Sequence, residues 1–280
     1  MAIQLATKFA PYTDELFKAE SKTALLTNTD FDWTGAHTVS VWKINTVAMQ
    51  DYGRNRSAED SETVSRYGNL IDLSAQTEEM MLTKDRSFIF NVDKMDTEET
   101  SGQIEAASAL AREVREVVIP EVDTYVYAKM VAGAGETATA AALTKANIYE
   151  NILAGSAALD DNEVPDTERV LIVSPATYSI LKQAVGETAY NDVDAELRKL
   201  GVVSMLDGMM VVKVPAARLP ENFGFMIAHP GATVAPVKLE DYGVHNDTPL
   251  SSGSIVTGRI VYDCFVLENK ANGIYYHAIA

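Results

Sequence analysis

The chain has 280 residues, of which 47% are hydrophobic, and a formal net charge of −17. This length and composition are typical of a globular protein with a sizeable core and exclude a chain that is disordered throughout. The acidic balance and the lack of any run of about 18 apolar residues exclude a strongly basic nucleic-acid binder and a helical membrane protein. The N-terminal sequence has no signal-peptide pattern, so we expect the chain to stay in the cytoplasm where it is made.

Residues 1–35 are expected to form an arm and not a domain. Their apolar residues are scattered and interrupted by Pro11, with one short helix expected over residues 13–21. Phe9 and Phe17 supply aromatic area that is rarely left in water. We therefore expect the arm to bind a neighbouring molecule and not its own chain's core. The alternative is a frayed terminus.

The next segment predicts an extended β-hairpin with a charged tip. Residues 37–50 alternate as a strand, with Val39, Val41 and Lys43 on one face and Trp42 on the other. Short apolar strand segments return at residues 70–73, 80–82 and 88–90. The candidate contact residues of the tip are Arg54, Arg56, Glu62 and Arg66. A ribbon of this kind is marginal by itself, so we expect it to lie across a neighbour, with a solvated loop as the alternative.

A long helix is predicted from Asp96 to Lys129, with Asp96 as its cap and Glu99 as the capping-box partner. Apolar or small residues recur in steps of three or four along one face: Ile104, Ala107, Ala111, Val114, Val118, Val122 and Tyr125. The other face is acidic, with Glu105, Glu113 and Glu116. Pro120 is expected to kink the helix, and Gly133 to end it.

Residues 140–236 predict a self-contained α/β unit. We expect a helix from Thr144 to near Gly155, a helix begun by Ser174 and Pro175, and three apolar strands over residues 169–173, 209–214 and 224–228. The chain closes with GRIVYDCFVLENKANGIYYH, residues 258–277. This pattern of strand, Gly/Asn turn and strand predicts a hairpin. Its first strand would span about 30 Å at roughly 3.3 Å per residue, a length that suits an element bracing something extended.

The residues that most often carry chemistry are not grouped in this sequence. The four histidines, His37, His229, His245 and His277, lack the spacing of a zinc motif. Cys264, the single cysteine, is expected to be a small apolar side chain on a buried strand. The segment from Gly133 to Gly135 lacks the Lys of a phosphate loop, and the sequence has no G-x-S-x-G elbow. We therefore predict no cofactor, no metal site and no enzymatic activity.

The order of arm, extended hairpin, long acidic helix, α/β unit and closing strands resembles the major capsid proteins of tailed bacteriophages with the Hong Kong 97-like fold. Residues 81–97 (MLTKDRSFIFNVDKMDT), 117–129 (VVIPEVDTYVYAK), 225–241 (FMIAHPGATVAPVKLED) and the closing segment support the likeness. The resemblance implies an α+β fold with an N-terminal arm (1–35), an E-loop (36–83), a peripheral strand and spine helix (84–135), an axial domain (136–238) and peripheral closing strands (239–280).

The same resemblance implies a structural protein that assembles as pentamers and hexamers into an icosahedral shell around double-stranded DNA. Assembly would occur in the host cytoplasm and the product would be part of the virion. The implied partners are other copies of the chain, a portal and packaged DNA bound without sequence specificity. Because the arm begins at Met1, the resemblance implies either a separate scaffolding protein or none. No membrane is implied.

The resemblance also assigns roles to candidate residues. Phe9 and Phe17 of the arm and the residues of the hairpin tip would contact other subunits. Glu105, Glu113 and Glu116 would face the shell interior, where their charge would let a genome slide past. The alternative is that they only keep the subunit soluble or pair with Arg residues of adjacent chains.

A further departure from the family concerns cross-linking, and two alternative functions are open. Some members join subunits by an isopeptide between an E-loop Lys and an Asn, but here Lys43 and Lys84 lie near the hairpin base and the tip has only Arg, so we expect no cross-link. An encapsulin-like shell around a protein cargo is the nearest alternative, and the irregular, Pro-containing arm favours the virion shell over it. A soluble enzyme would instead be a monomer or small oligomer.

Overall fold

The computed structural model describes residues 21–28, 38–44, 46–52, 66–67, 70–72, 75–99, 105–185, 202–246 and 252–280. The chain forms two compact units, residues 35–82 and the remainder, and each is described by itself. We call residues 35–82 the hairpin unit. The helix expected over residues 13–21 lies outside the described residues, except for its last residue.

The hairpin unit contains two antiparallel strands, β1 (Thr38–Ile44) and β2 (Ala75–Met81), paired from Thr38 opposite Met81 to Ile44 opposite Ala75. This pairing confirms the predicted hairpin. Val39, Val41 and Lys43 are half-buried while Trp42 is exposed, as the alternation predicted. Residues 46–50 and 70–72 are exposed and are not strands, so the prediction was wrong there. Apolar residues without a surface to pack against do not by themselves form a strand.

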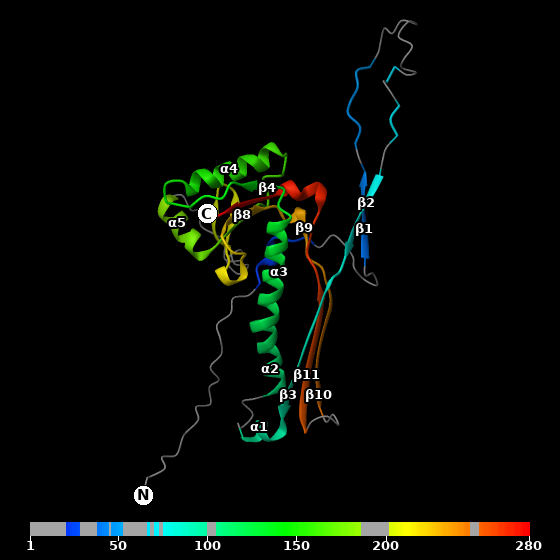
Figure 1. The fold of residues 1–280 in the computed structure, drawn as a ribbon, viewed down its shortest axis with the longest axis vertical. Helices are drawn as coiled ribbons and strands as arrows, with labels where there is room; N and C mark the ends of the chain where they lie inside the picture. The colour runs from blue at the N-terminus through cyan, green and yellow to red at the C-terminus, as the bar shows by residue number, and fades with distance from the viewer. Residues whose placement is uncertain are drawn as a thin grey trace. The chain divides into compact units, whose positions relative to one another are not determined.

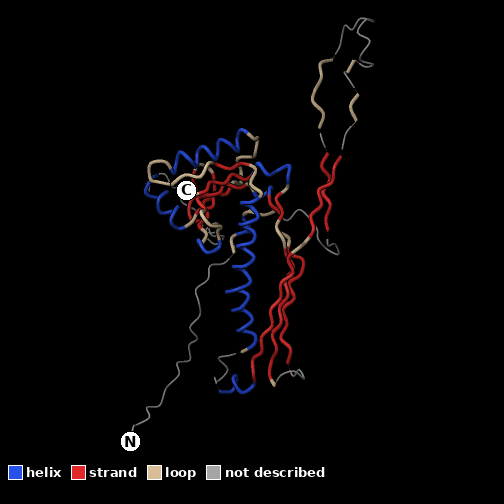
Figure 2. Tube along the Cα trace, in the orientation of Figure 1, coloured by secondary structure: helices blue, strands red, loops and turns tan. Residues whose placement is uncertain are grey.

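In the larger unit, three long antiparallel strands form one sheet in the order β10 (Val237–Asn246), β11 (Gly253–Tyr262) and β3 (Lys84–Asp93) (Figure 2). β11 is central and pairs along its whole length with β3, from Gly253 opposite Asp93 to Tyr262 opposite Lys84. Gly258 leaves the space that the ring of Phe88 fills, so Phe88 and Tyr242 stack with ring centroids 6.1 Å apart.

The helix beside this sheet is built from four pieces: α1 (Lys94–Glu99), α2 (Ala106–Glu113), a π-helical stretch η2 (Val114–Val118) and α3 (Ile119–Ala132) (Figure 1). The prediction of one helix capped by Asp96 was wrong. Asp93, at the end of β3, accepts the hydrogen bond from the Met95 amide at 2.9 Å, so α1 begins before Asp96. α2 begins separately, after an extended Glu105. The end of α3 before Gly133 confirms the predicted terminus.

The face of the helix that packs on the sheet shifts along its length. Val118, Val122 and Tyr125 pack against the sheet as predicted. Upstream, Ala106 and Leu110 pack there, whereas the predicted Ala107 and Ala111 are exposed. A π-turn contains one extra residue, which moves the buried face upstream by one position.

The kink predicted at Pro120 is replaced by this π-helical stretch, and Figure 1 shows α2 and α3 continuing in one line. In a regular α-helix, Pro120 would leave the carbonyl of Glu116 without its donor and would crowd it. We attribute the π-helical stretch directly before Pro120 to relief of that conflict.

A six-stranded mixed sheet forms the α/β region. In spatial order it consists of β4 (Glu136–Ala138), β13 (Ile274–Ala278), β8 (Phe223–Ala228), β5 (Val170–Val173), β7 (Met209–Lys213) and β6 (Val202–Leu206). Alternate residues of β5 face opposite sides: Val170 and Ile172 pack with α3, and Leu171 and Val173 pack with α4 (Ile148–Asp161) and α5 (Pro175–Val185). The sheet therefore lies between α3 on one face and α4 and α5 on the other.

The predicted closing hairpin is wrong. β11 ends at Tyr262, β12 (Phe265–Val266) pairs with β9 (Thr233–Val234), and a 3-10 segment η6 (Glu268–Gly273) leads into β13. β13 then pairs with β4 and β8 and not with β11. Residues 140–236 are therefore not self-contained, because β4 and β13 complete their sheet. The actual hairpin is β10 with β11.

Local signals around the two helices of this region were partly correct. Ser174 Oγ accepts a hydrogen bond from the Thr177 amide at 3.1 Å, which confirms the predicted cap of α5. α4, however, begins after Asn147 and continues past Gly155 to Asp161. Gly155 lies where the ring of Tyr275 approaches within 2.7 Å of the position of a Cβ atom. It permits close packing of α4 on β13 and does not end the helix.

Residues 21–28, which we call the strap, pack on the core of their own chain. They include the 3-10 turn η1 (Thr23–Leu25) and Leu26, which is 0% exposed and lies in a cluster with Tyr127 and Met130. The Asn28 amide donates to the Thr233 carbonyl at 2.9 Å. The expectation that the whole of residues 1–35 avoids its own core is therefore wrong for the strap, because Leu26 completes that core.

Candidate functional site

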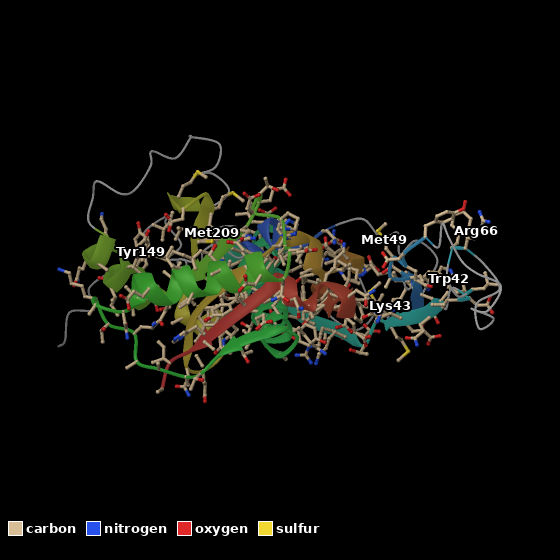
Figure 3. All side chains as sticks on the ribbon, turned by 90° about the horizontal axis from the view of Figure 1, so that it is seen from above. Trp42, Lys43, Met49, Arg66, Tyr149 and Met209 are labelled. Atoms are coloured by element: carbon tan, nitrogen blue, oxygen red, sulfur yellow. The ribbon has the colours of Figure 1, made fainter. Side chains whose placement is uncertain are left out.

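The hairpin unit exposes large apolar side chains as well as charge. Trp42 is 69% exposed, Met49 100% and Leu70 96%, and Figure 3 shows Trp42, Met49 and Arg66 on this unit. Large apolar side chains exposed to water are a feature that surfaces in contact with other proteins often have. The sequence analysis chose the charged residues of the tip as contact candidates and did not include these apolar side chains. Of the predicted tip residues only Arg66 is described, in an exposed turn; Arg54, Arg56 and Glu62 lie outside the described residues, as do Phe9 and Phe17.

Both lysines considered for cross-linking have local partners. Lys43 Nζ lies 3.1 Å from the Glu78 carboxylate, and both side chains are mostly buried. Lys84 Nζ lies 5.0 Å from the ring centroid of Tyr125, within cation–π range. These contacts hold each ammonium group against its own unit.

The three carboxylates of the predicted acidic face lie in different environments. Glu105 is exposed at the start of α2, Glu113 is half-buried, and the Glu116 side chain is only 13% exposed, with Oε1 3.7 Å from Arg115 Nη2. The structure thus does not bring them together on one exposed face. Two features separate them: Glu105 precedes α2 in an extended conformation, and the π-helical stretch changes the rotation between Glu113 and Glu116 from that of a regular α-helix.

Asp263 is a buried carboxylate that the sequence interpretation missed. It is 2% exposed and follows directly after β11. Its Oδ2 accepts from the amide and hydroxyl of Thr83 at 2.8 and 2.7 Å, and its Oδ1 from the hydroxyl of Tyr125 at 2.7 Å and the amide of Cys264 at 2.8 Å. Burial acts to raise the pKa of Asp263, but the bonds from Thr83, Tyr125 and Cys264 outweigh it and hold the pKa below its ordinary value. A charged residue inside the apolar run VYDCFV was the available signal.

A second missed group joins the strap to the core. Asp123 on α3 and Arg218 are both buried, and Arg218 Nη1 donates to Asp123 Oδ2 at 2.6 Å. Ser21 Oγ donates to the other oxygen of Asp123, also at 2.6 Å. Lys22 Nζ donates to the Lys213 carbonyl at 2.9 Å, and burial, with the charges of Lys213 and Arg218, lowers the pKa of Lys22. These bonds fix the first residues of the strap, Ser21 and Lys22, on the core of their own chain.

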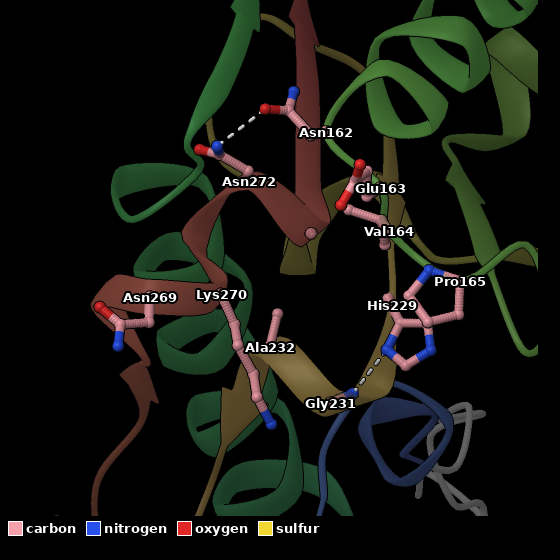
Figure 4. A pocket seen from close by; sticks show the side chains of 11 residues that line it. Asn162, Glu163, Val164, Pro165, His229, Gly231, Ala232, Asn269, Lys270 and Asn272 are labelled. Carbon is pink, nitrogen blue, oxygen red and sulfur yellow. Dashed lines mark hydrogen bonds between the residues drawn. The ribbon is translucent and has the colours of Figure 1, made fainter. Parts of the chain in front are cut away.

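A cavity of about 320 Å³ lies between the end of α4 and the 3-10 turns η5 (Pro230–Ala232) and η6 (Figure 4). Its polar side chains are mainly paired with one another or with the backbone. Asn272 Nδ2 donates to Asn162 Oδ1 at 2.9 Å, and His229 Nδ1 accepts from the Gly231 amide at 3.0 Å. Burial lowers the pKa of His229, so its ring is neutral near pH 7. This lining does not select one class of ligand.

The part of the chain that the structure describes contains no group of three or more His, Cys, Asp or Glu side chains arranged to hold a metal ion. None of the helices described is both long and apolar enough to cross a membrane.

Comparisons with known proteins give a matching family and solved structures of the same fold. The family model "Phage capsid protein" matches residues 60–276. Among solved structures, that of Mycobacterium phage Che8 is 17% identical, covering 98% of this chain and 96% of that chain with a TM-score of 0.75. The capsid of Cyanophage P-SCSP1u is 14% identical, covering 98% and 93% with a TM-score of 0.72.

A virus-like particle from Pyrococcus furiosus is less similar, with 11% identity, 91% and 90% coverage and a TM-score of 0.53. No curated protein sequence matches the chain.

Proposed function

The chain belongs to the phage capsid protein family and is a major capsid protein, and from this premise we propose that its copies assemble as pentamers and hexamers into an icosahedral shell that encloses double-stranded DNA. The observation that carries the proposal is the family match over residues 60–276, which spans part of the hairpin unit, the long helix and nearly all of the three-stranded and six-stranded sheets of the larger unit. Assembly in the host cytoplasm, a separate scaffolding protein and a portal belong to the same proposal.

The exposed surface of the hairpin unit supports contacts between subunits. Trp42, Met49 and Leu70 would each leave water in a contact with another copy, a gain of about 1.5–3 kcal/mol for a fully buried large side chain. Repetition of such a contact around a closed shell would make assembly favourable even if each contact is weak.

The net charge of −17 supports a genome that is enclosed without being bound tightly. Proteins that bind DNA through its phosphates do so with clusters of Lys and Arg, and their affinity falls steeply with salt. An acidic subunit instead repels the genome weakly. A shell around a protein cargo is the second candidate, supported by the likeness to the virus-like particle, but that likeness is weaker than the likeness to phage capsids.

Electron microscopy and sedimentation of the expressed protein, together with its scaffolding protein, test the proposal. We expect closed particles with five-fold and six-fold clusters of subunits, and DNA protected from nuclease when particles form during infection. Particles that hold protein and no DNA would support the cargo shell. A protein that stays monomeric at every concentration and scaffold ratio would contradict both.

The charged tip can be tested separately. We expect the double substitution Arg54→Glu and Arg56→Glu to block assembly without unfolding the subunit, because each exposed pair contributes about 0.2–1 kcal/mol and recurs around the shell. A matched control is Lys145→Glu with Lys182→Glu, which makes the same change in net charge at exposed positions of the α/β region. Shells of the tip variant that match wild type in salt and heat tolerance would show that the tip is a solvated loop.

A further inference from the structure

The hydrogen bonds of Asp263 lie at one of the two covalent junctions between the units, the one between residues 82 and 83. Thr83 is the first residue after the hairpin unit, and β3 begins at the next residue. Asp263 Oδ2 accepts both the amide and the hydroxyl hydrogen of Thr83, at 2.8 and 2.7 Å. Two bonds from one residue to one oxygen fix the backbone of Thr83 as well as its side chain.

The second oxygen of Asp263 connects this junction to the helix and to the end of the central strand. Oδ1 accepts from the Tyr125 hydroxyl on α3 and from the Cys264 amide. An ionised carboxylate can accept about four hydrogen bonds, so all of its capacity is used. A buried charge is tolerated only when it is satisfied in this way, which restricts the group to one arrangement of its donors.

Tyr125 is itself held in place on several sides. The ammonium groups of Lys84 and Lys129 lie 5.0 and 5.5 Å from its ring centroid, and the ring of Tyr262 meets it edge-on at 5.6 Å. Burial, followed by the hydrogen bond to Asp263, raises the pKa of Tyr125 to about 12, so its hydroxyl stays a donor at any physiological pH. The donor and the acceptor are therefore both preorganised.

We propose that Asp263 is a positioning residue for shell assembly, because it fixes the root from which the hairpin unit leaves the rest of the subunit. Thr83 is tied by this one carboxylate to α3 and to the end of β11. Differences in the direction of the hairpin unit between positions in the shell would then arise on the hairpin side of Thr83. This inference rests on the proposed shell function.

The chemistry of the site suggests four variants. Asp263→Asn has nearly the same shape, but its amide group has one acceptor oxygen and brings a donor toward other donors. Thr83→Val removes only the hydroxyl bond, whereas Thr83→Ser keeps it. Thr177→Val is the matched control, since the buried Thr177 hydroxyl donates to the Gly224 carbonyl at 3.0 Å, away from the junction.

The experiment compares unfolding of the isolated subunits with the particles that they form under one set of conditions. We expect Thr83→Val and Asp263→Asn to lower the yield of closed shells by about tenfold or more, with open or irregular sheets in their place, because a bond to a charged group is lost in every subunit. Thr83→Ser and Thr177→Val should assemble as wild type does, although Thr177→Val loses subunit stability comparable to that lost by Thr83→Val.

Closed shells of wild-type yield from Thr83→Val, or an equal loss from Thr177→Val, would overturn the inference and leave the shell function intact. If Asp263→Asn does not fold, Thr83→Val decides the matter. If wild type itself forms no shells, the proposed function fails. Hydrogen exchange at Thr83 in the subunit then tests the junction alone: faster exchange in Thr83→Val than in Thr83→Ser supports the fixed root, and equal exchange refutes it.

Discussion

At the scale of single residues, two buried carboxylates tie α3 to distant parts of the chain by different means. Asp123 is balanced by a cation, since Arg218 donates to it at 2.6 Å and both side chains are at most 5% exposed. Asp263 is balanced by four hydrogen-bond donors. The stability that Asp123 contributes therefore depends on the presence of Arg218. The stability that Asp263 contributes depends on its carboxylate staying ionised.

The depressed pKa of Asp263 gives a prediction for acid. Its folded-state pKa lies below the ordinary 3.8, so its contribution to stability is complete above the ordinary value and is lost as the pH falls through the folded-state pKa. The free energy of unfolding of Asp263→Asn should be lower than that of wild type at pH 7, and the difference should narrow below about pH 4. Urea unfolding of subunits between pH 7 and pH 3 measures it. A constant difference would show that the loss comes from the amide donor that Asn brings toward the donors around residue 263, and not from loss of the carboxylate charge.

Arg218 gives a second prediction. Arg218→Met leaves Asp123 buried without its cation, and we expect a loss of about 3–5 kcal/mol in the free energy of unfolding. The double variant Asp123→Leu with Arg218→Met removes both charges and should recover most of that loss. Denaturant unfolding of the two variants and of wild type provides the comparison. If the double variant is no more stable than Arg218→Met, the pair stabilises the fold through the shape and hydrogen bonds of its side chains and not by compensating each other's charge.

At the scale of elements, η2 decides which side chains of the helix reach the sheet. Downstream of it Val118 and Val122 pack there, and upstream Ala106 and Leu110 do. One extra residue in a π-turn connects two stretches that would otherwise present different faces. The position of this stretch follows from Pro120, which disfavours a regular α-helix over the preceding turn.

Deleting Val117, which is 47% exposed, together with Pro120→Ala should convert η2 into a regular α-helix without rotating α2. We expect a change of about 1 kcal/mol or less in the free energy of unfolding. Deleting Thr124 with the same Pro120→Ala is the matched control, because it rotates the upstream helix by about 100° and turns Leu110 from the sheet. Thermal and denaturant unfolding compare them. Equal losses in both would contradict the assignment of η2 as an inserted residue.

The strap packs on the core of its own chain, so the first 35 residues do not all serve as an arm. Its Leu26 is fully buried, although all of residues 1–35 were expected to contact neighbours. Deleting residues 1–20 should leave the free energy of unfolding unchanged and prevent stable shells. Deleting residues 1–28 should also destabilise the subunit, by about the 2–5 kcal/mol expected for Leu26→Ala. Normal shells from the shorter deletion would refute the role of the arm in contacts between subunits.

At the scale of the whole molecule, the net charge of −17 is multiplied by the number of copies in a shell. In the proposed shell, such a charge would act on an enclosed genome at distances up to about 10 Å at 0.1 M salt. On this scale the environment of one Glu matters less than the number of carboxylates on the inner surface. Glu105, Glu113 and Glu116 remain our candidates for that surface.

Replacing Glu105, Glu113 and Glu116 by Gln should leave folding intact and increase the nucleic acid retained by shells. Glu116 is mostly buried, so its neutralisation also removes the cost of a buried charge. The ratio of absorbance at 260 and 280 nm, measured on nuclease-treated particles, reports the retained nucleic acid. Mutant shells that fill normally and retain no extra nucleic acid would show that these carboxylates only keep the subunit soluble.

The sequence by itself determined the elements whose signals are local. Strand β5 follows from an apolar run, the start of α5 from the Ser174 cap, and the end of α3 from Gly133. The family was also visible in the order of these elements. Local signals are sufficient there because hydrogen bonds within a few residues, or burial of a whole segment, fix each element.

Only the tertiary structure decided which strands pair and which polar groups meet. Alternation in residues 258–277 shows that strands exist, but it does not show that β13 pairs with β4 and β8 and not with β11. The donors to Asp263 come from residues 83, 125 and 264, and the spacing of these residues in the sequence gives no hint that they meet. Strand pairing and buried polar contacts depend on the packing of the whole chain, so they cannot be predicted from local sequence patterns.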